Sequence, residues 1–442
     1  MRHVNRRDFL KTSLGTVAVV AGWPQRLSRA AGEKVTIGVM GLGGRGRGLA
    51  QMFAARADVQ IAYLCDADSR RFEPAKRAIE QAQGKAPQMV QDFRRILDDK
   101  SVDVLINATP DHWHALGTIM ACQAGKDVYV EKPLAHNVWE GRKMIEAARK
   151  YRRVIQVGTQ TRSAPYVQAA IEQVRNGKLG DVHLIRVFNM MRHSPRPAGS
   201  VQPVPDGFDY DLWCGPAPKL PYNPSRWWLN QWEYSCGPIA GDAIHQLDLA
   251  RMLLGDRPYP DTVAHTGGVR ALKDGREIPD TQFALFEYGS MTLVFEAALW
   301  TPYIKKIPQE IRNSDSFPDW PFCSTRIEVL GTKSFMYLGR HGGGWQIHDA
   351  DGNVAGSLFG RQADKEHQDN FIECVRTRNR PNADVEQGHY STLLCHLANI
   401  SYLVGNQKLT LDPKTETFAN TPAANRHLRR TYREPWVIRD EV

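Results

Sequence analysis

A glycine pattern near the start of the chain has the residue types and spacing of a dinucleotide-binding turn. The segment Gly41-Leu-Gly43-Gly-Arg-Gly46 fits G-x-G-x-x-G, follows the apolar segment 34–40 and precedes a helical stretch at 47–56. Gly41 permits the tight turn, Gly43 lets the backbone approach a pyrophosphate, and Gly46 permits close packing of helix on strand. N–H groups at the start of the helix would bind the phosphates. The expected cofactor contacts of this turn are Gly41, Leu42, Gly43, Gly44, Arg45 and Gly46.

An acidic residue stands at the distance that such a turn requires. Asp66 lies 20 residues beyond Gly46, at the end of a second apolar segment, 59–65. Its carboxylate would accept hydrogen bonds from the adenosine ribose hydroxyls and would repel a 2′-phosphate, which favours NAD over NADP. Arg70 and Arg71 follow closely and act against that choice, because an arginine can accommodate a 2′-phosphate.

His245 is the first candidate for a catalytic base. Oxidation of an alcohol at a nicotinamide needs a group that removes the hydroxyl proton, and histidine titrates near neutral pH. In a regular α-helix, Asp242, His245 and Asp248 share one face, and apolar residues form a stripe on the opposite face. Either aspartate could orient the imidazole and stabilise its charged form. A solvated helix face would show the same spacing.

Lys132 is the second candidate for the chemical step. It follows the expected strand 127–130, at the carboxyl edge of the sheet, where doubly wound folds place their ligands. Its ammonium group can bind the substrate hydroxyl and the nicotinamide ribose, so it could share the proton transfer with His245. A surface lysine fixed by Pro133 would explain the same residues.

Polar and aromatic residues further along the chain are candidates for the remaining contacts. Gln160 and Arg162 follow the expected strand 154–157 and would line the nicotinamide end. Trp228 and Trp232 precede the histidine helix, and their flat rings could stack on the C–H face of a sugar or pack the loop.

Strands and helices alternate around these residues in the first part of the chain. Expected helices at 47–56, 115–124 and 138–151 separate expected strands at 34–40, 59–65, 102–108, 127–130 and 154–157. Continuous apolar strands of this kind predict a parallel, doubly wound α/β sheet, which forms a Rossmann domain over residues 33–157.

The pattern changes after about residue 158. Strands with short links are expected at 183–188, 281–288, 291–296, 326–330 and 334–338, with a tight turn at Tyr288-Gly-Ser290. This predicts an α+β domain over 158–442 with a mainly antiparallel sheet. Helices at about 364–378 and 388–404 would pack back on the body, and 192–224 would form a long ordered loop.

Several further motifs resemble the Gfo/Idh/MocA family of sugar oxidoreductases. They are Thr109-Pro110-Asp-His-Trp-His114, Glu131-Lys132-Pro133, the segment 236–248 that contains His245, and the tail Arg433-Glu-Pro-Trp436. The resemblance covers nearly all of 33–442. It implies a Rossmann domain joined to a domain with a large open sheet, whose face often forms an oligomer interface. A homodimer or homotetramer is therefore expected.

The resemblance also extends the expected site. It implies that the cofactor contacts include Thr109, Pro110, His112, His114, Glu131, Lys132 and Gln160, and that the substrate contacts include Lys132, Asp242 and His245. The sequence departs from the family pattern at the carboxylate that precedes the histidine. The family usually has Asp four residues before the histidine, where this chain has Gly241 and Asp242 follows. No metal site is expected at His112 and His114, because no further ligands cluster nearby.

The first thirty residues resemble a twin-arginine export signal. Asn5-Arg6-Arg7-Asp8-Phe9-Leu10-Lys11 is followed by a short apolar run at 14–22 and by small residues up to Ala30. The resemblance predicts that the twin-arginine machinery exports the folded protein to the periplasm or beyond the membrane. A basic N-terminal tail is the alternative.

Composition and charge exclude several other classes of protein. The chain has 442 residues, of which 42% are hydrophobic and 24% charged, as in globular proteins. The net charge is +9, but the leader carries +5 of it and no nucleic-acid-binding motif is present. The seven cysteines are dispersed without a Cys-x-x-Cys pair, so they indicate neither a disulfide framework nor a zinc site.

The sequence thus predicts an exported, NAD-dependent oxidoreductase that acts on a secondary hydroxyl of a carbohydrate. In one version the hydride passes on to a second substrate. In the other, a glycoside is oxidised transiently, its glycosidic bond is eliminated and the hydride returns, as in some exported relatives. A non-catalytic sugar- or NAD-binding protein is a further alternative. Free NAD is scarce outside the cytosol, so an exported enzyme of either kind is expected to hold its NAD tightly.

Overall fold

The computed structural model describes residues 33–196 and 199–442. Within it, Lys34–Val442 form one compact unit. The expected leader, with Arg6 and Arg7, lies outside the described residues. None of the described helices is both long and apolar enough to cross a membrane.

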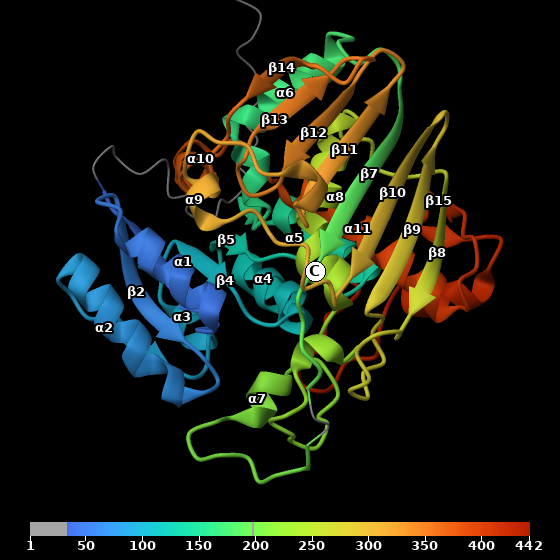
Figure 1. Cartoon of the computed structure of the whole chain (residues 1–442). Coiled ribbons are helices and arrows are strands. Elements are labelled where there is room, and N and C mark those ends of the chain that lie inside the picture. The colour runs from blue at the N-terminus through green and yellow to red at the C-terminus, as the bar shows by residue number, and fades with distance from the viewer. Residues whose placement is uncertain (1–32, 197–198) are drawn as a thin grey trace, which may run out of the picture. The chain divides into compact units, whose positions relative to one another are not determined.

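The first part of the unit is a six-stranded parallel sheet (Figure 1). Its order is β3-β2-β1-β4-β5-β6, and every pair is parallel. The strands are β1 Val35–Met40, β2 Val59–Cys65, β3 Gln88–Val90, β4 Val104–Asn107, β5 Asp127–Val130 and β6 Ile155–Val157. The predicted doubly wound sheet is confirmed. Strand β3 was not expected, because it has only three residues and two of them are exposed.

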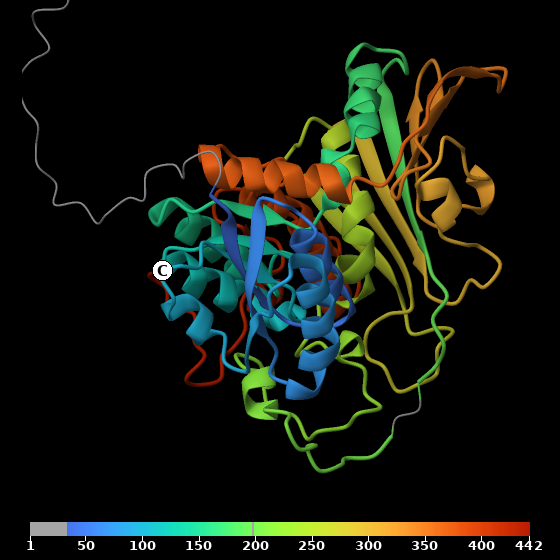
Figure 2. The ribbon, with the colours of Figure 1, turned by 90° about the vertical axis from the view of Figure 1, so that its left-hand side faces the viewer.

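Helices cover both faces of this sheet. They are α1 Gly44–Ala54, α2 Phe72–Gln83, α3 Arg94–Asp98, α4 His114–Gln123 and α5 Val138–Lys150. Buried residues of α1 and α2 form one apolar cluster with the sheet, and those of α3, α4 and α5 form another on the opposite face. Helix α10 (Asp364–Thr377), from far along the chain, joins the first cluster through Phe371 (Figure 2).

The second sheet has eight strands in the order β14-β13-β12-β11-β7-β10-β9-β8. They are β7 Val182–Met190, β8 Thr262–Gly268, β9 Thr281–Tyr288, β10 Met291–Ala298, β11 Arg326–Gly331, β12 Phe335–Gly339, β13 Trp345–His348 and β14 Val354–Leu358. All pairs are antiparallel except β10 with β7, which confirms the prediction of a mainly antiparallel sheet. Tyr288 pairs with Met291 across the expected tight turn.

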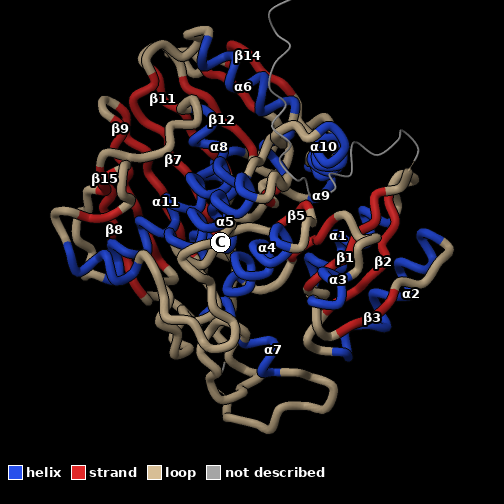
Figure 3. Tube along the Cα trace, turned by 180° about the vertical axis from the view of Figure 1, so that it is seen from behind, coloured by secondary structure: helices blue, strands red, loops and turns tan. Residues whose placement is uncertain are grey.

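Three helices bury one face of the large sheet (Figure 3). They are α6 Pro165–Arg175, α8 Ile244–Leu253 and α11 Val385–Leu403. Helix α11 contacts both α5 and β8, so it joins the two sheets. Side chains on β9 alternate between buried and more exposed, which leaves Phe283 and Leu285 on the uncovered face. The smaller elements are α7 Tyr210–Cys214, α9 Gln309–Arg312, β15 Leu411–Asp412 and β16 Thr417–Phe418.

The segment 236–248 is not one regular α-helix, so that expectation was wrong. Ile239–Ala243 form a π-helix, and α8 begins only at Ile244. A π turn closes its hydrogen bonds from residue i to i+5 and therefore holds more residues than an α turn. The spacing of 100° per residue fails across it, so Asp242 and Asp248 need not share a face with His245.

Candidate functional site

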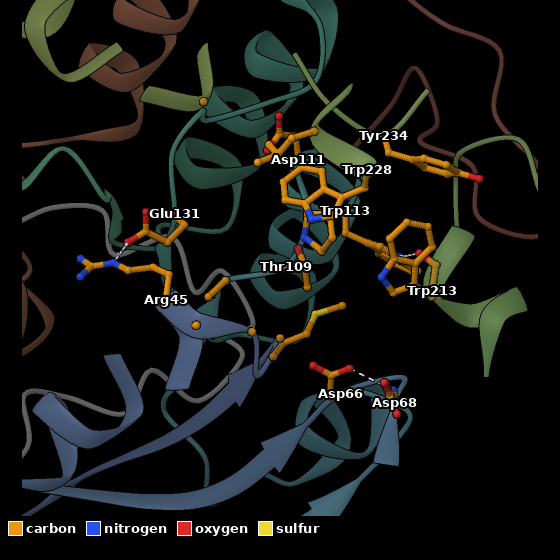
Figure 4. Close-up of a pocket in the computed structure, with 18 of the residues that line it drawn as sticks. Arg45, Asp66, Asp68, Thr109, Asp111, Trp113, Glu131, Trp213, Trp228 and Tyr234 are labelled. Carbon is orange, nitrogen blue, oxygen red and sulfur yellow. Dashed lines mark hydrogen bonds and ion pairs between the residues drawn. The ribbon is translucent and has the colours of Figure 1, made fainter. Parts of the chain in front are cut away.

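One cleft collects most of the expected site residues (Figure 4). It has a volume of about 820 Å³ and lies at the carboxyl ends of β1, β2, β4 and β5. The turn after β12, residues between 208 and 245, and residues at 160–161, 196 and 362–364 also line it. A crevice at this edge of a doubly wound sheet is where such folds bind their ligands.

The glycine turn has the conformation that its sequence predicts. Gly41 has a φ of +91°, in the region that favours glycine. A Cβ on Gly46 would lie 1.8 Å from the carbonyl oxygen of Gly41, so no larger residue fits there. No side chain caps α1, and Gly43, Gly44 and Arg45 line the cleft. The first turn of α1 can therefore offer its N–H groups to a pyrophosphate.

Asp66 directly follows β2, beside this turn. Its Oδ2 accepts a hydrogen bond from the Leu42 N–H at 2.7 Å, and its Oδ1 accepts one from the Asp68 N–H at 2.9 Å. Arg70 is occupied by Asp68, at 2.7 Å, and the Arg71 Nε lies 3.6 Å from Asp68 and 3.9 Å from Asp66. Both arginines thus face carboxylates, and the residues present fit a ribose with free hydroxyls, as in NAD.

Arg45 connects the glycine turn to the strand β5 edge. Its Nε donates to Glu131 at 2.7 Å, as Figure 4 shows, and Gln160 Nε2 lies 3.3 Å from the same carboxylate. Burial would raise the pKa of Glu131, but the charges of Arg45 and Lys132 outweigh it and lower the pKa. Arg45 also contacts Asp364 at 3.3 Å, which ties α10 to the turn.

Lys132 and His245 both line the cleft. The Lys132 ammonium donates a hydrogen bond to the carbonyl oxygen of Gly241, in the π turn that precedes α8. His245 is 7% exposed, and no described residue hydrogen-bonds its ring. Burial, together with the charges of Arg340 and Lys132, holds the pKa of His245 well below its usual value. The imidazole is therefore neutral and can accept a hydrogen bond.

Asp242 binds cations rather than the imidazole. Its Oδ1 lies 3.0 Å from Arg340 Nη1, and its Oδ2 lies 3.2 Å from Lys306 Nζ. Burial would raise the pKa of Asp242, but the charges of Arg340 and Lys306 lower it. The carboxylate stays ionised beside the cleft and acts on His245 only through these neighbours.

Asp248 and Arg162 do not line the cleft, so their expected placement was wrong. The two side chains are 2% and 4% exposed and form an ion pair of 2.7 Å. Arg162 also binds Asp256 at 2.8 Å, and the Ser391 hydroxyl donates to Asp248 at 2.6 Å. The π turn separates the face of Asp248 from that of Asp242, and a buried carboxylate in this position takes a buried cation as its partner.

His112 and His114 are buried and do not line the cleft either. His114 Nδ1 lies 2.6 Å from the Pro133 carbonyl oxygen, and its Nε2 lies 2.9 Å from that of Thr109. It therefore holds together the two segments that carry Thr109 and Lys132. The ring nitrogens of His112 contact the carbonyl oxygens of Trp213 and Tyr234, and burial lowers the pKa of His112 to about 3.

Of the remaining expected contacts, some line the cleft and one does not. Thr109, Pro110, Gln160 and Trp228 line the cleft. Trp232 is not among the lining residues and packs against Tyr402 instead. Over residues 33–196 and 199–442, no three potential metal-binding His, Cys, Asp or Glu side chains come together.

Asp111, Arg340 and His341 are among the polar lining residues that the sequence analysis missed. Asp111 lies inside the recognised motif, and its Oδ2 accepts a hydrogen bond from the Cys236 N–H at 2.9 Å. Burial raises the pKa of Asp111. Arg340 and His341 follow β12 and reach the cleft from the second sheet. The one local signal for them is the glycine run that follows, at 342–344.

A segment that we call the strap, residues 205–222, covers the end of β2. The Ser69 N–H donates to the Gly207 carbonyl oxygen at 2.9 Å, and the Asp209 N–H donates to that of Ala67 at 2.9 Å. Phe208 and other aromatic side chains of the strap line the cleft. The strap contains α7, in the loop at the bottom of Figure 1. It encloses the part of the cleft beside Asp66.

Two proteins of similar sequence and one solved structure resemble this chain. A levoglucosan dehydrogenase of Pseudarthrobacter phenanthrenivorans is 28% identical over 175 residues, which cover 40% of this chain and 39% of that protein. A glycosyl hydrolase family 109 protein of Solibacter usitatus is 30% identical over 174 residues, or 34% and 38% of the two chains. The chain thus matches less than two thirds of the length of either relative.

The third comparison is with a solved structure. The WlbA dehydrogenase from Bordetella pertussis, in complex with NADH and UDP-GlcNAcA, superimposes with a TM-score of 0.62 at 20% identity. The match covers 86% of this chain and 99% of that chain, and it shows a shared fold.

Two family models match the chain in succession. The oxidoreductase family model for an NAD-binding Rossmann fold matches residues 35–159. The model for the C-terminal alpha/beta domain of the same family matches residues 171–401, which is more than half of the chain. The glycine turn and Asp66 lie within the first match. The protein belongs to the Gfo/Idh/MocA oxidoreductase family.

Proposed function

We propose that this protein is an NAD-dependent oxidoreductase that acts on a secondary hydroxyl of a carbohydrate. The observation that carries the proposal is that Lys132 and a neutral, buried His245 line the same cleft as the glycine turn and Asp66. A proton acceptor and a hydroxyl-binding cation are what such an oxidation requires at the carbon that loses hydride. When bound, NAD supplies the hydride acceptor.

Each residue of the cleft has a separate role in the proposed oxidation. His245 takes the proton of the reacting hydroxyl, because its imidazole is neutral and has no protein hydrogen bond among the described residues. The Lys132 ammonium binds the hydroxyl oxygen and stabilises the negative charge that develops there. The Gly241 carbonyl oxygen holds the ammonium in position. The first turn of α1 binds the pyrophosphate of the dinucleotide, and Asp66 binds the hydroxyls of its adenosine ribose.

A carbohydrate is the substrate class that the relatives support. One relative is named a levoglucosan dehydrogenase, and the WlbA structure holds UDP-GlcNAcA. Trp228 adds a flat ring to the lining, suited to the C–H face of a sugar.

A redox-neutral glycosidase is the second candidate. The relatives named glycosyl hydrolase family 109 proteins favour it. In this version the hydroxyl is oxidised only transiently, the glycosidic bond is eliminated and the hydride returns to the sugar. The strap favours a cofactor that stays bound through such a closed cycle.

Export and self-association belong to the same proposal. The Arg6-Arg7 signal supports passage through the twin-arginine machinery to the periplasm or beyond. Phe283 and Leu285 are 41% and 42% exposed on the uncovered face of the large sheet, which supports a homodimer or homotetramer.

The variants Lys132→Met and His245→Ala test the function. NAD-loaded wild-type protein is mixed with a panel of sugars and aryl glycosides, and NADH absorbance and released phenol are recorded. We expect each variant to lose at least about 100-fold in hydride transfer, as is usual for a lost acid–base group. Both should still bind NAD, because the glycine turn and Asp66 remain.

Lys365→Met is the matched control, since Lys365 is 82% exposed on α10 and outside the cleft lining. Phenol release without net NADH would favour the glycosidase version. Near-normal turnover in both cleft variants would contradict the proposed function.

A further inference from the structure

The most unusual side chain in the cleft is Arg340, on the turn that follows β12. It is 4% exposed, yet it lines the cleft. Its Nη1 lies 3.0 Å from the Asp242 carboxylate, and its buried Nε has no hydrogen-bond partner among the described residues. A buried guanidinium is costly unless its N–H groups are satisfied. The structure therefore leaves Arg340 with unused hydrogen-bonding capacity inside the cleft.

The backbone around Arg340 is built to hold it there. The Thr161 hydroxyl donates to the Arg340 carbonyl oxygen at 2.8 Å, and the Tyr166 hydroxyl donates to that of Gly339 at 2.7 Å. The next residues, 342–344, are three glycines with φ between +66° and +78°. A Cβ on Gly344 would lie 1.8 Å from the Leu358 carbonyl oxygen. The turn is thus fixed between the segment 161–166, which follows β6, and the end of β14.

Charge around this turn is not balanced. Lys306, Arg312 and Arg340 share a single acid, Asp242, and in the described part of the chain no second carboxylate pairs with any of the three. Lys132 adds a further positive charge across the cleft. The pKa of His341 is well below its usual value because of burial and the charges of Arg340 and Arg312. This corner therefore has a positive potential that a neutral ligand would leave uncompensated.

The chemistry of the corner suits an oxyanion. A guanidinium fork binds carboxylates, sulfates and phosphates through two parallel hydrogen bonds, and such bonds are stronger than those to a neutral hydroxyl. We propose that Arg340 recognises a carboxylate, sulfate or phosphate group on the substrate, so that the oxidised carbohydrate is an acidic sugar. This rests on the proposed function, because it names the class of sugar that the same cleft accepts.

The corner lies close enough to the reacting groups to act on one sugar unit. His341, the neighbour of Arg340, has its ring centroid 6.4 Å from that of His245. Arg340 would thus bind the anionic substituent while His245 and Lys132 act on a hydroxyl of the same ring. Arg340 is a specificity-determining residue in this proposal, and it takes no part in the proton transfer.

Calorimetric titration of matched sugar pairs tests the proposal. Glucuronate with glucose, galacturonate with galactose, and glucose with its 6-sulfate and 6-phosphate are titrated into the NAD-loaded protein. We expect at least one acidic member to bind at least about 10-fold more tightly than its neutral partner, and to weaken as salt is added. The three kinds of anion distinguish a carboxylate from a sulfate or phosphate substrate.

Variants assign the preference to the corner. Arg340→Gln should abolish the preference for acidic sugars, and Lys306→Met should weaken it. The Lys306→Met variant provides the test if Arg340→Gln does not fold. Arg380→Gln is the matched control, because Arg380 is 69% exposed and pairs only at 3.7 Å with Glu386. Equal binding of all pairs, or an unchanged preference in Arg340→Gln, would overturn the proposal.

The same samples separate this inference from the proposed function. If the protein oxidises only neutral sugars and this activity depends on Lys132, the oxyanion site is contradicted and the proposed oxidoreductase function is supported. If anions bind in a manner that depends on Arg340 but no sugar yields NADH, the oxyanion site is supported and the proposed oxidoreductase function is contradicted.

Discussion

At the scale of single residues, the reactivity of His245 depends on its surroundings and not on a carboxylate partner. Burial and the nearby charges of Arg340 and Lys132 keep the imidazole neutral. Asp242 binds Arg340 and Lys306, so it tempers these charges without touching the ring. The lowered pKa keeps the ring unprotonated at and below neutral pH, so it is free to accept the hydrogen bond of a substrate hydroxyl, and it also makes the imidazole a weaker base.

Asp248 belongs to a buried ion-pair network, and its removal tests that assignment. Asp248→Asn leaves the Arg162 guanidinium with one carboxylate fewer in a buried position, so we expect the free energy of unfolding to fall by about 3 kcal/mol. Urea denaturation measures the loss. Hydride transfer per folded molecule should be unchanged.

A double variant provides the control. Arg162→Met with Asp248→Leu replaces the pair by apolar side chains and should recover part of the stability. If Asp248→Asn instead kept its stability and lost hydride transfer, the carboxylate would have to be part of the chemical site.

At the scale of elements, the strap explains how a dinucleotide could be retained. It contacts the loop after β2 through backbone hydrogen bonds from Ser69 and Asp209, on the side of the cleft that holds Asp66. Gly207 has a φ of +80°, and a Cβ there would lie 2.6 Å from the Ser69 hydroxyl oxygen. A larger residue there would strain the backbone and displace the Ser69 hydroxyl, which donates a hydrogen bond to the Gly207 carbonyl oxygen at 2.9 Å.

Gly207→Ala should therefore loosen the cofactor. Gly84→Ala is the matched control, since Gly84 has a φ of +70° but a Cβ there would meet nothing within 4 Å. Both variants should lose about 1 kcal/mol of stability through backbone strain. Only Gly207→Ala should lose NAD on dialysis, measured by absorbance at 260 nm. Equal retention in the two variants would show that the strap does not hold the cofactor.

Elements with strong local signals were predictable, and those set by tertiary contacts were not. Strands β2 and β5 match their expected bounds because continuous apolar runs end at polar residues. The π turn before α8 leaves no trace in residue spacing, so the faces of Asp242 and Asp248 were misassigned. Arg340 reaches the cleft through the pairing of β12 in a sheet whose register the sequence does not show.

At the scale of the whole molecule, buried histidines make stability depend on pH. Burial lowers the pKa of His112 and His396 to about 3 and that of His367 to about 4. In the unfolded chain these groups titrate near 6.5. Below that pH the unfolded state binds more protons, so the free energy of unfolding falls as the pH falls. The raised pKa values of Asp66 and Asp111 act in the opposite direction.

Each buried histidine should contribute about 1.4 kcal/mol per pH unit below pH 6.5. We expect urea denaturation to show a steep loss of stability between pH 6.5 and 5. His396→Gln should reduce the slope by about that amount, whereas His183→Gln, at an exposed position, should not. A stability that stays constant down to pH 5 would mean that these imidazoles are not neutral in the folded protein.

Oxidation of a sugar in the Lys132–His245 cleft can be observed directly. NAD-loaded protein is mixed with neutral and acidic sugars, and absorbance at 340 nm is followed over the first turnover. We predict a rise with at least one sugar in the wild-type protein, and no rise in Lys132→Met or His245→Ala protein that still carries NAD. An equal rise in all three proteins, or none with any sugar, would contradict the proposed chemistry.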